Sequence, residues 1–221
     1  MSTVNYIEDD YHKNRHPEFL SSIKLSEAWS NFVYLEYFKK AKDKDILEFG
    51  GAMGYNLIES SKYNHVVMIE PSQLGRKTAS ALGIQSYSDI SEMQKMKDGF
   101  LFDIILCRHV LEHVHDPLMV LKDLKLLLKP GGLLILVLPY EKQLSPVKNE
   151  IDFHLFCWTP RTAINLLNVA GFNIMKWKYN FFTGKRLFYF VYKNFGVNLY
   201  SFSLKVIGRI LNAKEIVIYC S

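Results

Sequence analysis

The chain has 221 residues, of which 49% are hydrophobic and 22% charged, and its net charge is +5. This composition is ordinary for a soluble globular protein, and the length is sufficient for one α/β domain. The longest strongly apolar run, residues 131–139, is too short to span a membrane. The first residues lack the apolar core of a signal peptide, and the three cysteines are widely separated, so we expect a cytoplasmic protein.

Short apolar segments alternate with helical patterns through the first 140 residues. Strands are expected at residues 45–49, 66–69, 84–87, 102–107 and 133–138, and helical segments at 55–58, 78–82 and 118–128. Lys129-Pro130-Gly131-Gly132 is a stop signal for the last of these helices. The alternation predicts an α/β fold, namely a doubly wound, mostly parallel sheet with helices on both faces. In such sheets, ligands bind beyond the carboxyl ends of the strands.

The pattern changes after Pro139. Residues 140–152 are polar and predict a loop, and Thr159 with Pro160 begins a helix that runs to residue 170. The remaining segments are expected to form strands at residues 172–179 and 215–220, with an aromatic, basic helical segment at 185–212 between them.

A glycine-rich turn, Glu48-Phe49-Gly50-Gly51-Ala52-Met53-Gly54, follows the first strand. Gly50 and Gly51 let the backbone approach a ligand without a side-chain clash. The spacing differs from that of a pyrophosphate-binding G-x-G-x-x-G turn, and the carboxylate of Glu48 would repel a phosphate. A cationic nucleotide without a pyrophosphate is the better ligand, and the alternative is a plain tight turn.

Acids also follow the next two strands. Glu70 ends the second strand, where a carboxylate can accept hydrogen bonds from both ribose hydroxyls of a nucleoside. Asp89 follows the third strand and is a candidate partner for an adenine amino group. Either Ser88 or Asp89 would serve equally as a helix N-cap.

Four segments together resemble class I S-adenosylmethionine (SAM)-dependent methyltransferases of the small-molecule type. ILEFGGAMG is similar to their first motif, and VVMIEPS is similar to their second. FDIILCRHVLEHVHDPLMVLKDLKLLLKPGGLLILVLP resembles their fourth strand, the helix after it and their fifth strand, and HLFCWTPRTAINLLNVAGF resembles the helix that commonly follows. The resemblance covers residues 41–180. It implies a Rossmann-like sheet of seven strands whose last strand is antiparallel.

The resemblance also implies a single methyltransferase domain, 1–221. Within it, residues 1–40 would form an N-terminal helical cap, residues 41–140 the SAM-binding core, and residues 141–221 the acceptor-side loop, helices and C-terminal strands.

SAM is the cofactor that the resemblance implies. Glu48 would lie near its methionine amino group, Glu70 would bind its ribose and Asp89 its adenine. The complete set of implied cofactor-binding residues is Glu48, Gly50, Gly51, Ala52, Gly54, Glu70, Pro71, Ser88, Asp89, Cys107 and Arg108. This chain departs from the family pattern by having Ala52 for a common glycine and Glu48 for the commoner aspartate. Because alanine is small and glutamate keeps the negative charge, we expect this chain still to bind SAM.

The stretch CRHVLEHVHD, residues 107–116, contains H-x-x-E-H, a spacing found in one class of zinc peptidases. Its position directly after a buried strand, at the predicted crevice, argues against a peptidase helix. In quinone-biosynthesis O-methyltransferases, which this segment also resembles, the matching E-x-x-E-H cluster can hold a divalent cation. A site of His109, Glu112 and His113 is therefore an alternative to hydrogen bonds that fix the loop. We predict no bound metal.

An oxygen acceptor usually needs a base that removes its proton. The candidate catalytic residues are His109, His113 and His154, the last of which lies in the loop expected over the crevice. A structural histidine is an equally good interpretation of His154.

The charge distribution bears on the acceptor. Residues 153–214 carry nine basic residues and no acid, which favours an anionic partner, although such runs are often only a solvated face. We expect a small-molecule or sugar acceptor that is methylated at oxygen, such as an anionic glycan or a nucleotide-sugar, and no nucleic acid partner. The alternatives are a lipid or quinone O-methyltransferase at a membrane surface, since residues 185–193 mix aromatic and basic side chains, and a non-catalytic SAM- or nucleoside-binding module.

Overall fold

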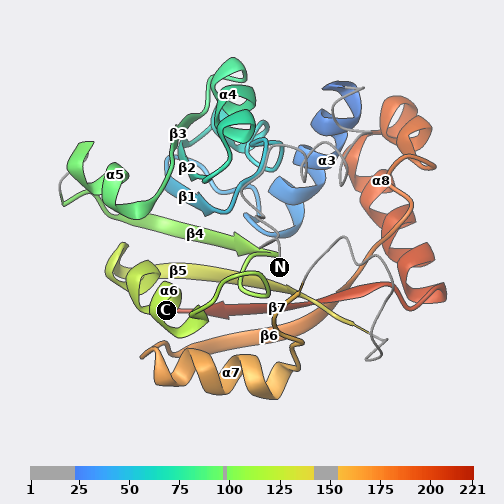
Figure 1. Ribbon diagram of the computed structural model, residues 1–221. Helices are drawn as coiled ribbons and strands as arrows, with labels where there is room; N and C mark the ends of the chain where they lie inside the picture. The colour runs from blue at the N-terminus through green and yellow to red at the C-terminus, as the bar shows by residue number, and fades with distance from the viewer. Residues whose placement is uncertain (1–22, 97–98, 142–153) are drawn as a thin grey trace, which may run out of the picture.

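One seven-stranded sheet organises the computed structural model, which describes residues 23–96, 99–141 and 154–221 (Figure 1). The strands are β1 (Asp45–Phe49), β2 (His65–Ile69), β3 (Gln85–Tyr87), β4 (Phe102–Arg108), β5 (Leu128–Pro139), β6 (Ile174–Phe181) and β7 (Lys214–Cys220). Their order across the sheet is β3-β2-β1-β4-β5-β7-β6, and only β7 runs antiparallel to its neighbours. The predicted α/β fold, with its mostly parallel sheet and antiparallel last strand, is confirmed.

Helices cover both faces of the sheet. The helices are α3 (Ile23–Glu36), α4 (Gln73–Ala81), α5 (Ile90–Met96), α6 (Pro117–Leu126), α7 (Pro160–Val169) and α8 (Tyr189–Ile210). Helices α5, α6 and α7 pack with one set of strand side chains, and α3, α4 and α8 pack with the other set. Alternate residues of each strand therefore enter different cores, as the two-residue period of a strand requires.

The strand register brings five strand ends to one edge. Phe49 at the end of β1 pairs with Ile69 at the end of β2 and with Cys107 near the end of β4. Pro139 at the end of β5 pairs with Glu215 at the start of the antiparallel β7. The residues that follow β1, β2, β4 and β5, and those that begin β7, thus share the edge where α/β proteins bind ligands.

The prediction of a helix at residues 55–58 is wrong. Turns occupy this segment, and a single 3-10 turn, η1 (Ser60–Lys62), follows. Side chains of α3 satisfy its polar groups instead of intrahelical bonds: the Ser30 hydroxyl donates to the Asn56 carbonyl and accepts from the Glu59 N–H, at 3.3 and 2.7 Å. These bonds compete with the helical hydrogen-bond pattern.

Other boundaries shift by a few residues. Helix α6 ends at Leu126, and the lysine, proline and glycines after it belong to β5, whose register against β4 is irregular there. Strand β6 begins two residues later than expected. Thr159 caps α7 as predicted, with its hydroxyl accepting from the Thr162 N–H. Most of the loop predicted at 140–152, and residues 1–22 of the predicted N-terminal cap, lie outside the described residues. None of the helices within the described ranges is long and apolar enough to cross a membrane.

Candidate active site

The glycine-rich turn after β1 is built without room for side chains. Gly50 and Gly54 adopt positive φ angles of 74° and 77°. A Cβ atom on Gly50 would lie 2.3 Å from the Val110 side chain, and one on Gly51 would lie 2.4 Å from the Met68 side chain. These two glycines are therefore required by close packing as well as by the turn. Ala52 also has a positive φ, 48°, at the position where the family commonly has glycine.

Glu70 holds this turn against the end of β2. Its buried carboxylate accepts hydrogen bonds from the Ala52 N–H at 2.8 Å and from the Ser72 N–H at 2.9 Å. Pro71 is exposed, and its carbonyl accepts from the Arg76 guanidinium at 2.6 Å. One carboxylate thus fixes two loops at the ligand edge.

Glu48 is a buried acid at the end of β1. The Asn56 side chain donates to its Oε1, and Asn56 in turn accepts from the Trp29 indole N–H at 2.7 Å. Its Oε2 has no hydrogen-bond partner among the described residues. Burial raises the pKa of Glu48 to about 8. A buried carboxylate oxygen of this kind is suited to a cationic ligand group, which would favour the ionised form.

The residues after β3 form a helix start. The carboxylate of Asp89 accepts from the Glu92 N–H at 2.8 Å, as an N-cap does, and Ser88 donates to both Asp89 and Glu92. Asp89 is exposed. Of the two candidates for the cap, Asp89 therefore takes that role, and its predicted contact with adenine stays a prediction.

The last two residues of β4, Cys107 and Arg108, have different surroundings. Cys107 lies fully in the core, so that only its backbone faces the edge. Arg108 donates to Glu215 Oε2 at 3.1 Å, and its guanidinium lies 5.2 Å from the Trp29 ring centroid. Tyr37 also donates to Glu215, and Asn180 donates to it at 3.2 Å. Residues from four elements thus form one buried polar network around Glu215.

His109 belongs to this network and not to a group with Glu112 and His113, which the sequence analysis gave as an alternative. Its buried Nε2 lies 3.2 Å from Glu215 Oε2, and its backbone has a positive φ of 54°. Burial, followed by the neighbouring Arg108 charge, lowers the pKa of His109 to about 4. Burial opposes ionisation of Glu215, but Arg108 and His109 outweigh it and lower its pKa to about 2. His109 is therefore neutral, and Glu215 ionised, at neutral pH.

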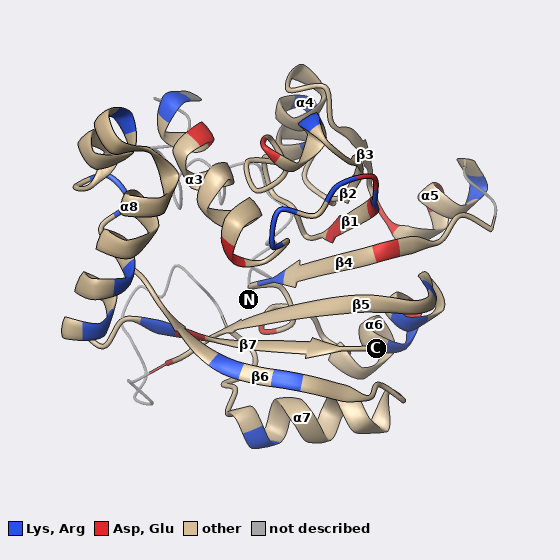
Figure 2. Cartoon of the chain, turned by 180° about the vertical axis from the view of Figure 1, so that it is seen from behind, with Lys and Arg blue, Asp and Glu red and all other residues tan. Residues whose placement is uncertain are grey.

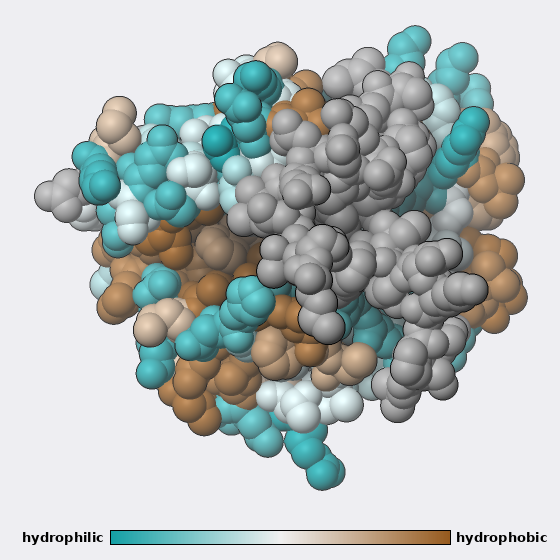
Figure 3. Space-filling model, viewed as in Figure 1, coloured by the Kyte–Doolittle hydropathy of each residue, from teal (hydrophilic) through white to brown (hydrophobic). Residues whose placement is uncertain are grey.

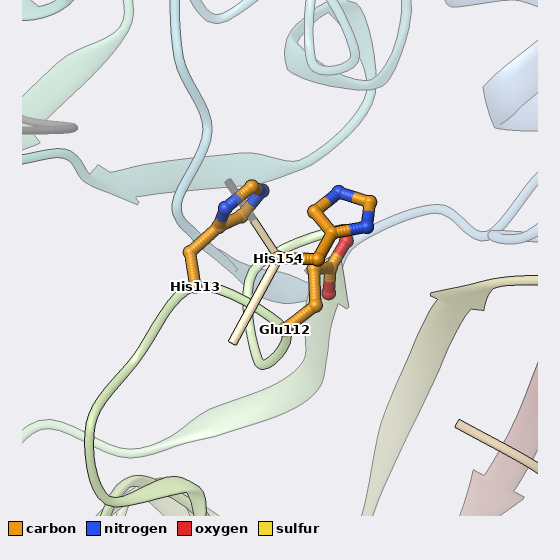
Figure 4. Close-up of side chains that lie close together, drawn as sticks. All are labelled: Glu112, His113 and His154. Carbon is orange, nitrogen blue, oxygen red and sulfur yellow. The ribbon is translucent and has the colours of Figure 1, made fainter. Parts of the chain in front are cut away.

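His113 and His154 come together instead. Their ring centroids lie 4.8 Å apart, and with Glu112 they form a group whose potential ligand atoms lie within 4.8 Å of one another (Figure 4). The Leu155 N–H donates to the Glu112 carbonyl at 2.7 Å, which ties the segment containing His154 to the loop after β4. His154 replaces His109 in the cluster that the sequence analysis placed at residues 109, 112 and 113. Two imidazoles and a carboxylate are chemically suited to zinc, and the expectation of no metal stays a prediction.

Glu141 completes the surroundings of His154. Its carboxylate pairs with His154 Nδ1 through one oxygen and accepts from the Cys157 thiol at 2.6 Å through the other. Although burial opposes ionisation, hydrogen bonds from Cys157 and His154 lower the pKa of Glu141. An ionised carboxylate on Nδ1 favours the tautomer whose Nε2 can accept a proton.

Sequence reasoning missed Glu215, Tyr37, Asn180 and Glu141. Glu215 carried a usable signal, because it is the only acid after residue 152 and it opens an apolar strand. An isolated acid in a buried strand needs a cationic partner. The other three carried no signal that distinguishes them from surface residues.

Comparisons with known proteins agree with this geometry. A family model described as "Methyltransferase domain" matches residues 15–190. A ubiquinone biosynthesis O-methyltransferase of Actinobacillus pleuropneumoniae is 37% identical over 71 residues, which are 29% of this chain and 30% of that protein. A tRNA U34 carboxymethyltransferase of Campylobacter fetus is 28% identical over 132 residues, which are 52% of this chain and 45% of that protein. The chain thus matches less than half the length of either relative.

Solved structures share the fold. A TehB-like SAM-dependent methyltransferase of Corynebacterium glutamicum has a TM-score of 0.63 at 12% identity, covering 97% of this chain and 99% of that one. A Burkholderia thailandensis 1,6-didemethyltoxoflavin-N1-methyltransferase, solved with S-adenosylhomocysteine, has a TM-score of 0.58 at 14% identity and covers 96% and 83%. Because the family model spans most of the chain and the sheet order agrees, the chain belongs to the methyltransferase domain family, the SAM-dependent class that its motifs resemble.

Proposed function

We propose that this chain transfers the methyl group of SAM to an oxygen atom of a small-molecule acceptor. The observation that carries the proposal is the His113–His154 pair, with Glu141 on His154, at the same sheet edge as the glycine-rich turn. Such an arrangement supplies a proton acceptor beside the place where a nucleotide cofactor would lie.

The turn fits SAM on chemical grounds. The buried Glu48 Oε2 suits the cationic amino group of the methionine part, and the glycines allow the cofactor to approach the backbone. The Glu70 carboxylate, which holds the Ala52 and Ser72 amides, stands at the strand end where the resemblance implies a ribose-binding acid. Asp89 would reach the adenine from the start of α5, and the backbone at Cys107 and Arg108 would line the cofactor.

When bound, SAM supplies an electrophilic methyl group on a sulfonium, so the protein mainly orients the reactants. Glu141 fixes His154 with its Nδ1 proton toward the carboxylate. The Nε2 lone pair of His154 would accept the acceptor's hydroxyl proton, and S-adenosylhomocysteine would leave as the methyl group passes from sulfur to oxygen. His113 packs edge-on against the His154 ring and holds it in place. His109, with its low pKa and its tie to Glu215, is a positioning residue in this scheme.

Two features support the class of acceptor. The relative that is 37% identical over its matched segment is named an O-methyltransferase. The basic residues of 153–214 favour an acceptor that bears a negative charge, such as a nucleotide-sugar or an acidic glycan. A tRNA acceptor is the second candidate, and its support is the 28% identical segment of a tRNA-modifying enzyme.

Release of S-adenosylhomocysteine tests the proposal. The purified chain is incubated with SAM and, in turn, with phenolic, sugar-nucleotide and tRNA acceptors. With the acceptor that gives turnover, His154→Ala should lower kcat by about 10²- to 10⁴-fold without changing SAM affinity in calorimetry. His115→Ala, which changes an exposed histidine of the loop after β4, is the matched control. An unchanged kcat for His154→Ala would exclude it as the base, and SAM binding without any turnover would favour a binding module. Metal analysis of the active protein tests the expectation of no metal.

A further inference from the structure

Helix α8 has an apolar outer face. Its buried side contains Tyr200, Leu204 and Gly208, which pack into the core beneath it. On the opposite side, four large hydrophobic residues recur at intervals of three and four residues, so that they share one face of the helix. We call them the α8 apolar face, and they are Leu199, Phe202, Val206 and Ile210.

This face is open to solvent. Phe202 keeps 64% and Ile210 70% of their maximal exposure, and hydrophobic surface is visible at the α8 edge on the right of Figure 3. A surface helix ordinarily presents charged and polar side chains on its outer side. Contiguous exposed apolar residues of this kind mark a surface that contacts another apolar phase.

The charged side chains of α8 itself are all basic. Arg186, Lys193 and Arg209 are exposed on α8 and the segment before it, and α8 itself carries no acid (Figure 2). The acid closest to the helix on its inner side, Glu36, is buried and already paired with Lys205 at 2.6 Å. Two copies of this chain that met through α8 would bring like charges together, which disfavours self-association. An anionic bilayer complements both the charge and the apolar residues.

We propose that the α8 apolar face and its flanking basic residues bind the surface of an anionic lipid bilayer, with the helix lying in the plane of the interface. Lys185, which precedes α8, lies 3.8 Å from the Trp29 ring centroid, and Trp29 also contacts Arg108 at the ligand edge. Lys185 therefore connects the segment before α8 with a residue of the ligand edge. The inference does not rest on which acceptor is methylated.

Flotation with vesicles tests it. The full chain, without SAM or acceptor, is mixed with vesicles of phosphatidylcholine alone or of phosphatidylcholine with phosphatidylglycerol. The protein should float with the anionic vesicles, float much less with the neutral ones, and be released by high salt. Phe202→Ser with Ile210→Ser should lower the partition coefficient at least about tenfold, because the bilayer would no longer bury these two apolar side chains. Leu126→Ser, which changes an equally exposed leucine on α6, should leave flotation unchanged.

A second pair, Lys193→Glu with Arg209→Glu, tests the charge separately and guards against a misfolded serine variant. Circular dichroism and SAM calorimetry confirm that each variant is folded. Failure of the wild-type chain to float would overturn the proposal, as would flotation that neither pair of substitutions reduces. A wild-type dimer in solution that the serine pair converts to a monomer, with no flotation, would assign the face to a second copy instead. None of these outcomes depends on methyl transfer, so they are distinguishable from failure of the proposed function.

Discussion

Two glutamates at the same edge of the sheet show how differently one fold treats a buried acid. Glu48, at the end of β1, has an amide donor and a raised pKa of about 8. Glu215, at the start of β7, is equally buried, yet Arg108 and His109 lower its pKa to about 2. Burial raises the pKa of both, but at Glu215 the Arg108 charge and hydrogen bonds from His109 and Tyr37 outweigh it. The Glu215 carboxylate therefore has its counter-charge within the described chain, whereas the Glu48 carboxylate is suited to a cationic group of a ligand.

Breaking the Glu215 network should have the largest effect. Glu215→Ala leaves the Arg108 guanidinium buried without its counter-charge, and we expect the free energy of unfolding to fall by about 3–5 kcal/mol. Urea unfolding measures it. Lys129→Ala, which removes a partly exposed pair of contacts to Asp45 and Asp103, is the control and should cost under about 1 kcal/mol. A loss for Glu215→Ala as small as the control's would mean that the network does not stabilise the fold.

The acid dependence has a defined sign. The folded pKa of Glu215 lies below its ordinary value of 4.5, so its stabilisation is present above pH 4.5 and is lost as the pH falls toward 2. Glu215→Gln should flatten this part of the stability profile.

Glu70→Ala should have the next largest effect, and it should be confined to the glycine-rich turn and the loop after β2. The Ala52 and Ser72 amides would lose their acceptor, at about 1–3 kcal/mol for each buried donor left unpaired. Because the glycine-rich turn would no longer be fixed, SAM affinity should fall sharply in calorimetry. Glu27→Ala, which removes an exposed acid of α3, is the control. Unchanged affinity in Glu70→Ala would mean that the turn forms without this carboxylate.

Glu48 should release a proton when SAM binds. With a folded pKa of about 8 it is largely protonated at pH 7, and a cationic group bound beside it should drive it to ionise. SAM binding at pH 7 should therefore release a proton, detected as a dependence of the calorimetric enthalpy on the ionisation enthalpy of the buffer. Glu48→Gln should abolish that dependence. In the free protein the sign is opposite to that of Glu215: the raised pKa makes stability fall as the pH rises from 4.5 through 8. A buffer-independent enthalpy in the wild-type chain would contradict this assignment.

Ala52→Gly should have the smallest effect. Alanine at a φ of 48° is strained, and glycine relieves the strain but adds freedom to the unfolded chain. We expect a gain of at most about 1 kcal/mol, measured as a higher Tm. Gly50→Ala is the opposite case, because its Cβ would clash with Val110, and it should destabilise. A lower Tm for Ala52→Gly would show that the alanine methyl packs favourably.

The sheet was predictable because its strands are continuous apolar runs bounded by strong turn signals. The segment after β1 was not, because its hydrogen bonds go to Ser30 and other side chains of α3, which the local pattern does not reveal. The candidate histidines are recognisable from the sequence, but the alternative grouping of His109 with Glu112 and His113 is not the one that the structure has. His109 turns to Glu215, which is 106 residues away in sequence, whereas His154 enters the cluster from a distant loop. Short-range spacing predicts which residues share a loop, and only the strand register decides which loops meet.

Strand β7 has a consequence for the order in which the molecule assembles. Asp45 and His65, which pair across β1 and β2, are 20 residues apart, whereas Leu134 and Cys220, which meet across β5 and β7, are 86 apart. Contacts between distant residues form slowly because a long loop must close first. In the described sheet, β7 joins β6 to β5 and supplies the counter-charge of Arg108. We therefore expect the Arg108–Glu215 pair to form late in folding, because it requires the long-range pairing of β7 with β5.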